Sequence, residues 1–251
     1  MLNLLVKFFT RLSAATAPGI RPAAEAPSGI VDIQFKKHPT SGEPGFHCGC
    51  GALIAPDKVV TAAHLLDISP WGPLGAADMQ VRIGSLDRTQ GGTLCDISDI
   101  QLHPDWRAEM GDVDLAILHL AERCDAEPFT IASRACEGNR ARRLLGWAVT
   151  DGIQPAEDDQ SKTARFLNEQ ETFLMPSFLV SQCTKKPVPE GFLCIGVREE
   201  MRFGASGAPV LCASDEGWVL EGILSHGIGG KLTLLPSLAV RLDLHHDWLM
   251  S

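Results

Sequence analysis

The apolar residues of this chain occur in short runs separated by Gly, Pro, Asn and Asp, a pattern typical of β-strands. The runs that we interpret as strands are IVDIQF (30–35), GALIA (51–55), KVVTAA (58–63), MQVRI (79–83), DLAILHL (114–120), RRLLGWAV (142–149), TFLMPSFLV (172–180), GFLCIG (191–196), APVLCA (208–213), WVLEGILS (218–225) and SLAVRL (237–242). Many short strands at such intervals predict an all-β barrel or sandwich. The last residues, LDLHHDWLMS (242–251), predict a short closing helix.

The first 29 residues differ from the rest, and we interpret 1–29 as a leader or linker. Lys7 and Arg11 interrupt the apolar core that a secretory signal needs, so a clean signal peptide is not predicted. No acidic residue precedes Glu25, and one helical face would carry Leu2, Leu5, Phe9 and Leu12. This segment is therefore compatible with an amphipathic helix that contacts a membrane, and equally with a disordered leader.

Composition narrows the class of protein. With 251 residues, 45% of them hydrophobic and 21% charged, the chain suits one large or two small folded domains. Its formal net charge of −9 argues against nucleic acid as a partner, because phosphate binding requires clustered Lys and Arg. No uninterrupted apolar stretch of about 18 residues predicts a membrane-spanning helix.

Three segments carry candidate chemistry. VVTAAH (59–64) places His64 after an apolar run, MGDVDLAILHL (110–120) places Asp114 before one, and RFGASGAP (202–209) places Ser206 between two glycines. Each is weak alone, since a serine between glycines also occurs in ordinary tight turns. Together they follow the order His, Asp, Ser, spaced 50 and 92 residues apart, which is the order in one of three unrelated triad folds.

Six segments in order then resemble the trypsin-like serine proteases of the chymotrypsin fold. They are GALIAPDKVVTAAH (51–64), DVDLAILHL (112–120), LLGWAV (144–149), GASGAPV (204–210), SHG (225–227) and PSLAVRLDLHHDWL (236–249). The resemblance runs from about Ile30 to Met250. It implies two six-stranded antiparallel β-barrels, expected at 30–135 and 136–251, with a short C-terminal helix and an active site between the barrels.

The resemblance also implies a serine endopeptidase that acts through an acyl-enzyme intermediate. Ser206 would be the nucleophile, His64 the general base, and Asp114 the acid that orients the imidazole. The backbone N–H groups of Gly204 and Ser206 would form the oxyanion hole. The expected partner is a protein or peptide substrate, with no cofactor and no metal, and the sequence does not indicate the oligomeric state.

Substrate contacts are implied at two places. By resemblance, an extended substrate would pair with the strand residues Ser225, His226 and Gly227. Glu200, six positions before Ser206, would form the floor of the primary specificity pocket and favour Arg or Lys in the substrate. Arg202 is close enough in sequence to neutralise it, and Ser237 would narrow the pocket. Alternatively, Glu199 and Glu200 are a solvated charge pair.

One position departs from the family. Ala205 stands where the family has an aspartate that pairs with a newly cut N-terminal amine. The stretch that we match to that terminus, SGIVDIQ, has no Arg or Lys before Ile30. This joint loss predicts an oxyanion loop that is ordered without cleavage, or an unidentified activator. The alternative is an inactive pseudoprotease that serves as a protein-binding module.

Eight cysteines test the same resemblance. It implies disulfides Cys136–Cys212 and Cys183–Cys194, and Cys95 and Cys124 flank strands that should be neighbours. Cys48 and Cys50 have no obvious partner, and with His47 they form an HCxC motif that lacks the further ligands of a structural zinc site. Bridges favour an oxidising compartment, whereas the lack of a clean signal peptide favours the cytoplasm, so localisation stays open.

Overall fold

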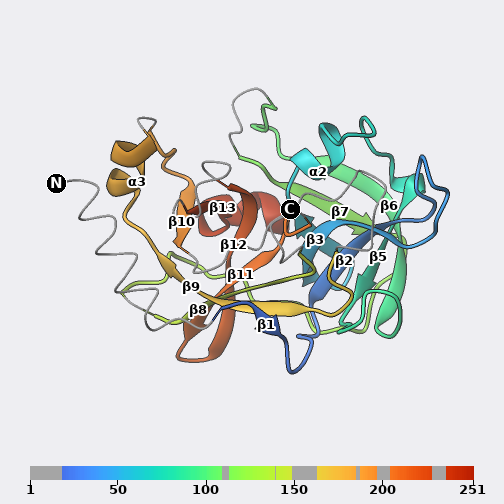
Figure 1. The fold of residues 1–251 in the computed structure, drawn as a ribbon, viewed down its shortest axis with the longest axis horizontal. Helices are drawn as coiled ribbons and strands as arrows, with labels where there is room; N and C mark the ends of the chain where they lie inside the picture. Colours follow the sequence, from blue (N-terminus) through green and yellow to red (C-terminus); the bar gives the residue numbers. More distant parts are fainter. Residues whose placement is uncertain are drawn as a thin grey trace.

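The computed structural model describes residues 19–108, 113–138, 140–148, 163–184, 187–196, 204–227 and 236–251. Two antiparallel β-barrels account for most of these residues (Figure 1). The strand-rich pattern of the sequence is thus confirmed, and so is the two-barrel fold that the resemblance implied.

The first barrel closes in the order β2-β3-β4-β7-β6-β5. Its strands are β2 (Ile30–Phe35), β3 (Phe46–Ala55), β4 (Lys58–Thr61), β5 (Met79–Ile83), β6 (Thr93–Leu102) and β7 (Ala116–Leu120). In β5, buried residues alternate with partly exposed ones, as expected for a strand with one face toward a barrel interior. Closure leaves this sheet without free edges.

The second barrel is a ring of six strands in the order β9-β10-β13-β12-β11-β8, closed by pairing of β8 with β9. Its strands are β8 (Arg142–Gly146), β9 (Asn168–Leu174), β10 (Phe192–Gly196), β11 (Pro209–Ser214), β12 (Gly217–Gly227) and β13 (Ser237–Arg241).

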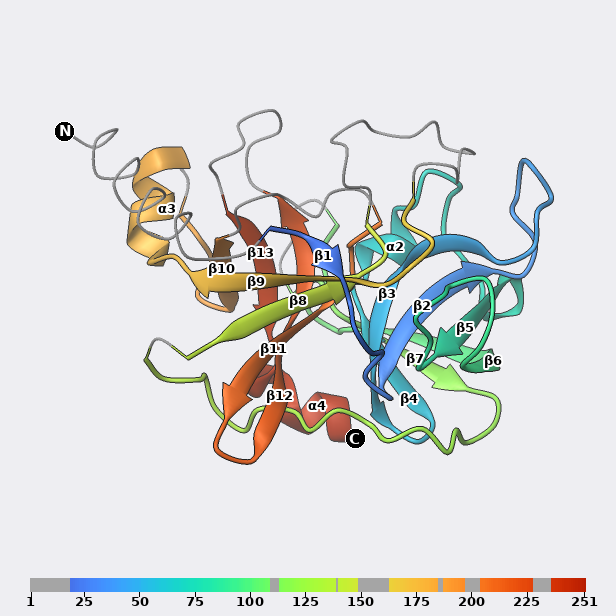
Figure 2. The same cartoon turned by 60° about the horizontal axis from the view of Figure 1, so that its bottom comes forward.

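Part of the segment predicted as a leader joins this second barrel. Strand β1 (Arg21–Pro22) pairs with β9, with Arg21 opposite Glu169. Figure 2 shows β1 beside β9, before the chain enters the first barrel at β2. The sequence did not indicate this strand, because a Pro-rich stretch is typical of a linker.

Few helices accompany the barrels. They are the α-helices α2 (His64–Asp67), α3 (Ser177–Thr184) and α4 (His246–Met250) and the 3₁₀ helices η1 (Ala76–Asp78) and η3 (Asp243–His245). Helix α4 confirms the predicted closing helix. No helix in the described ranges is long and apolar enough to cross a bilayer.

One local prediction in this list of strands was wrong. The run TFLMPSFLV was expected to be one strand, but β9 ends at Leu174. Pro176 follows, and its carbonyl accepts hydrogen bonds from Leu179 and Val180 as α3 begins. The stretch IVDIQF forms β2, as predicted. In the uncut chain Ile30 is fully buried in this strand, opposite Ala52 of β3.

Candidate active site

The three candidate catalytic residues come from both barrels. His64 follows β4 as the first residue of α2, and Asp114 lies just before β7. Since β4 and β7 are paired neighbours, with Thr61 opposite Ala116, His64 and Asp114 emerge at the same end of the pair. Ser206 lies in the loop before β11 of the second barrel.

A continuous chain of hydrogen bonds joins these residues. The distance from Ser206 Oγ to His64 Nε2 is 2.9 Å, and that from His64 Nδ1 to Asp114 Oδ2 is 2.6 Å. The backbone N–H of His64 also donates to Asp114 Oδ1 at 2.8 Å. Asp114 therefore fixes both the ring and the main chain of His64.

Asp114 is deeply buried but remains the acidic end of this chain. Burial by itself would raise the pKa of Asp114, but hydrogen bonds and charge from His64, and the hydroxyl of Ser225, lower it below its ordinary value. Ser225 Oγ donates to Asp114 Oδ2 at 2.5 Å. The carboxylate is thus stabilised in its ionised form.

His226 extends this network by one residue. Its Nδ1 lies 2.9 Å from Ser225 Oγ. Because Ser225 gives its only proton to Asp114, its oxygen must accept, so Nδ1 of His226 carries the proton. Partial burial lowers the pKa of His226; the charge of Asp114 opposes this, and His64 adds to it.

The backbone around Ser206 requires glycine on both sides. Gly204 has φ +93° and Gly207 has φ +79°, both in the left-handed region. A Cβ at Gly204 would lie 2.8 Å from the Trp147 carbonyl oxygen, and one at Gly207 only 2.0 Å from that of Cys50. Within the described parts of the chain, the N–H groups of Gly204 and Ser206 donate to no backbone acceptor.

A second His–Asp pair contacts the same loop, and it was not predicted from the sequence. His47 Nδ1 is 2.5 Å from Asp32 Oδ1, and its Nε2 is 3.0 Å from the Gly204 carbonyl oxygen. The available signal was an acidic residue inside the apolar strand IVDIQF. Both ring nitrogens of His47 are engaged, so the HCxC motif gains no metal ligand from this histidine.

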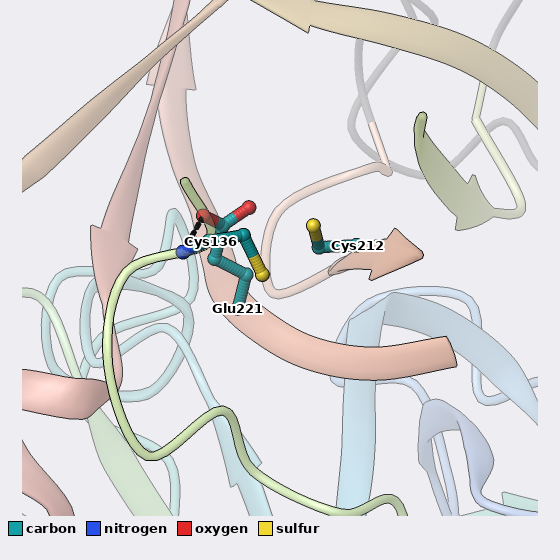
Figure 3. Close-up of side chains that lie close together, drawn as sticks. All are labelled: Cys136, Cys212 and Glu221. Atoms are coloured by element: carbon teal, nitrogen blue, oxygen red, sulfur yellow. Dashed lines mark hydrogen bonds between the residues drawn. The ribbon is translucent and has the colours of Figure 1, made fainter. Parts of the chain in front are cut away.

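The Cys136 and Cys212 thiols lie close together, as the family resemblance implied (Figure 3). Their sulfur atoms and a Glu221 carboxylate oxygen lie within 4.8 Å of one another. Burial, followed by the hydrogen bond with Cys212, raises the pKa of Cys136 to about 12. Arg142 contacts both Glu221 oxygens, at 2.7 and 3.1 Å, so this carboxylate is not free for a metal. The Cys136–Cys212 disulfide stays a prediction.

The structure describes only some of the other predicted site residues. Cys95 lies in contact with Cys124, as the neighbouring strands suggested. Burial, together with this contact, raises the pKa of Cys95 to about 11. Cys194 is buried in β10, whereas the Cys183 side chain lies outside what the structure describes, so their bridge stays a prediction. Glu200, with Glu199, also lies outside the described residues.

The two-barrel fold and this hydrogen-bonded triad define a protein of the chymotrypsin class. The Trypsin family matches residues 22–249, so the chain belongs to the trypsin family.

Individual relatives share about a quarter of their residues with this chain. Trypsin of Saccharopolyspora erythraea is 28% identical over 211 residues, 81% of this chain and 85% of that protein. Ovochymase of Halocynthia roretzi is 26% identical over 82% of this chain, which spans only 13% of ovochymase. Inactive CLIP domain-containing serine protease A28 of Anopheles gambiae is 27% identical over 90% of this chain and 61% of that protein.

A solved structure supports the fold independently. Neuropsin, a serine protease expressed in the limbic system of mouse brain, superposes with a TM-score of 0.71. The match covers 94% of this chain and 97% of neuropsin at 17% sequence identity. At this identity the likeness establishes the shared architecture.

Proposed function

We propose that this protein is a serine endopeptidase that hydrolyses peptide bonds through Ser206, His64 and Asp114. The observation that carries the proposal is the unbroken chain of hydrogen bonds from Ser206 Oγ through the His64 ring to Asp114. A serine hydroxyl is too weakly acidic to attack a peptide carbonyl unaided, so a base within hydrogen-bond reach is the first requirement.

In the first half of the reaction, His64 Nε2 takes the proton of Ser206 as Oγ bonds to the substrate carbonyl carbon. The C–N bond then breaks, and His64 returns that proton to the leaving amine. In the second half, His64 deprotonates a water molecule, whose oxygen bonds to the acyl carbon. The bond between that carbon and Ser206 Oγ then breaks, His64 returns the proton to Oγ, and the acid leaves. Asp114 stabilises the protonated ring in both halves.

The oxyanion of each tetrahedral intermediate needs hydrogen-bond donors. The N–H groups of Gly204 and Ser206 suit this role, because no described backbone acceptor engages them. The left-handed backbone at Gly204 supports the same assignment, since a turn of this type directs successive N–H groups toward one point.

Strand β12 offers a place for the substrate backbone. Its pairing with β11 ends at Ile223, whereas its pairing with β13 continues to Gly227 opposite Ser237. In the described chain, the β11 side of His226 and Gly227 is therefore an open sheet edge. An extended peptide can add to such an edge by main-chain hydrogen bonds. Glu200 remains our proposed specificity residue, favouring cleavage after Arg or Lys.

Labelling with a fluorophosphonate tests the proposal, because this reagent reacts with an activated serine in a formed oxyanion hole. We expect the wild type to label and to hydrolyse peptide substrates, and Ser206→Ala to do neither. A wild type that is folded and binds peptides, yet neither labels nor cleaves them, would favour the pseudoprotease alternative. Ala205 and the inactive relative from Anopheles gambiae are the observations behind that alternative.

A peptide library addresses specificity separately. Cleavage after Arg or Lys that is lost in Glu200→Gln would support the pocket assignment. Cleavage after small or apolar residues, unchanged in Glu200→Gln, would remove Glu200 from the pocket and leave the triad proposal intact.

A further inference from the structure

Residues Gly204 to Ala208, the nucleophile loop that precedes β11, form hydrogen bonds with strand β3 of the first barrel. The His47 ring and the Cys50 thiol both point to the Gly204 carbonyl oxygen, at 3.0 and 3.3 Å. The Cys50 N–H donates to the Ser206 carbonyl oxygen at 2.8 Å. The two residues whose N–H groups we assign to the oxyanion hole are therefore held through their own carbonyl groups.

The side-chain part of this attachment is the Asp32–His47 pair. The Gly204 carbonyl oxygen can only accept, so His47 Nε2 donates to it. Nδ1 faces the Asp32 carboxylate, and the exposed fractions of the two side chains are 2% for His47 and 0% for Asp32. Both ring nitrogens of His47 are thus engaged by other groups of the protein, which suits this side chain to hold the loop.

Asp32 is itself fixed from the side opposite His47. Its second oxygen accepts a hydrogen bond from the Gln34 amide at 2.5 Å, and that amide also donates to the Arg88 carbonyl oxygen at 2.7 Å. Both residues of β2 lie on one side of the strand, since side chains two positions apart share a face. A rigid strand therefore supports the imidazole.

We propose that Asp32 and His47 are positioning residues that set the orientation of Gly204, and through it the oxyanion hole. This inference rests on the proposed function. Ala205, buried inside the loop, contributes no polar side-chain group to this task. Because both members of the pair belong to the uncut chain, the loop is ordered without release of a new N-terminus.

Kinetics of His47→Leu on the full chain test the proposal. Loss of one oxyanion donor costs about 10²–10³-fold in kcat, so a loosened loop should cost about 10- to 100-fold with KM within about threefold. His47→Gln should recover part of kcat, because its amide can still donate to the Gly204 carbonyl oxygen. Asp32→Asn, which preserves side-chain shape, should lower kcat in the same direction and serves if His47→Leu does not fold.

The matched control is Glu221→Gln. Glu221 and Arg142 form a second ion pair of equal burial, with exposed side-chain fractions of 1% and 2%, and neither residue contacts the nucleophile loop through a hydrogen bond in the described structure. We expect this variant to lose stability but keep kcat. An equal loss of kcat in Glu221→Gln would reduce the effect to general destabilisation and overturn the proposal.

A readout independent of catalysis separates this proposal from the proposed function. In a Ser206→Ala background, the N–H groups of Gly207 and Ala208 are suitable probes, since both are bonded, to Leu224 and Ala205. Their hydrogen exchange should be faster by about tenfold or more in His47→Leu than in Glu221→Gln. Unchanged exchange and unchanged kcat in His47→Leu would overturn the positioning role. If the wild type never reacts with the fluorophosphonate but exchange is faster in His47→Leu, the positioning role would be supported and the proposed protease function contradicted.

Discussion

Two His–Asp pairs flank the same short loop, and they differ in what the far side of each imidazole meets. His64 and His47 contact their aspartates at 2.6 and 2.5 Å. His64 then meets the Ser206 hydroxyl, which can donate a proton, whereas His47 meets the Gly204 carbonyl, which cannot. The His64 side chain is 25% exposed and that of His47 2%. In our proposals, the third partner and the access to solvent, more than the pair itself, distinguish the base His64 from the supporting residue His47.

Removing the ring that meets the hydroxyl should have the largest effect. We expect His64→Ala to lower kcat on the order of 10⁴-fold or more, far beyond any substitution at His47. Peptide hydrolysis under saturating substrate measures it. The double variant His64→Ala/Ser206→Ala should be little worse than either single variant, because the groups act as a unit. Equal losses at His64 and His47 would break the comparison.

A side chain at Gly204 would disturb the residue whose carbonyl oxygen contacts the His47 ring. Gly204→Ala places a Cβ 2.8 Å from the Trp147 carbonyl oxygen and 3.0 Å from His47 Nε2, at a φ of +93°. We expect kcat to fall about 10²–10³-fold through loss of one oxyanion donor. Gly217→Ala is the control, because Gly217 also has positive φ but no atom within 4 Å of the added Cβ. It should lose stability and keep kcat.

The hydrogen-bond network of the His64–Asp114 pair continues through Ser225 to His226. Loss of the His226 contact should have a smaller effect. His226→Phe removes the N–H that donates to Ser225, while the Ser225 bond to Asp114 remains. One neutral hydrogen bond corresponds to about a threefold to tenfold loss in kcat. An unchanged kcat with a changed KM would instead assign His226 to substrate binding alone.

The smallest effect concerns pH and stability. The pKa of Asp114 is lowered from its ordinary value of 3.8, so ionised Asp114 stabilises the folded state. The difference in free energy of unfolding, wild type minus Asp114→Asn, should be constant from neutral pH down to about pH 5. It should then shrink as the pH falls through the lowered pKa. Urea titrations at several pH values measure it, and a difference that grows toward acid pH would contradict this sign.

Local patterns were sufficient for most of the fold. The strand MQVRI was predicted to the residue, because one buried face imposes strict alternation. Strand β6 was not predicted, since its sequence TLCDISDIQL mixes polar residues into a mostly solvent-facing strand. Helix α3 was taken for the end of a strand, because a short apolar run does not separate strand from helix.

The candidate site divides in the same way. His64, Asp114 and Ser206 were predicted because their three segments, each weak alone, follow the order of a known triad fold and resemble the motifs of one family. The contact between His47 and Gly204 joins residues 157 positions apart, and the sequence of neither segment indicates that it contacts the other. Such a contact depends on how two barrels pack, which no local periodicity encodes.

The attachment of β1 to β9 has a consequence for synthesis and folding. Arg21 bonds to Glu169 across 148 positions, so the start of the described chain finds its partner only after the whole first barrel has been made. Contacts of such sequence separation slow folding, because a long loop must close before they contribute. A ribosome-bound chain that ends before Glu169 therefore carries an unpaired β1, and this strand can pair only once β9 has been synthesised.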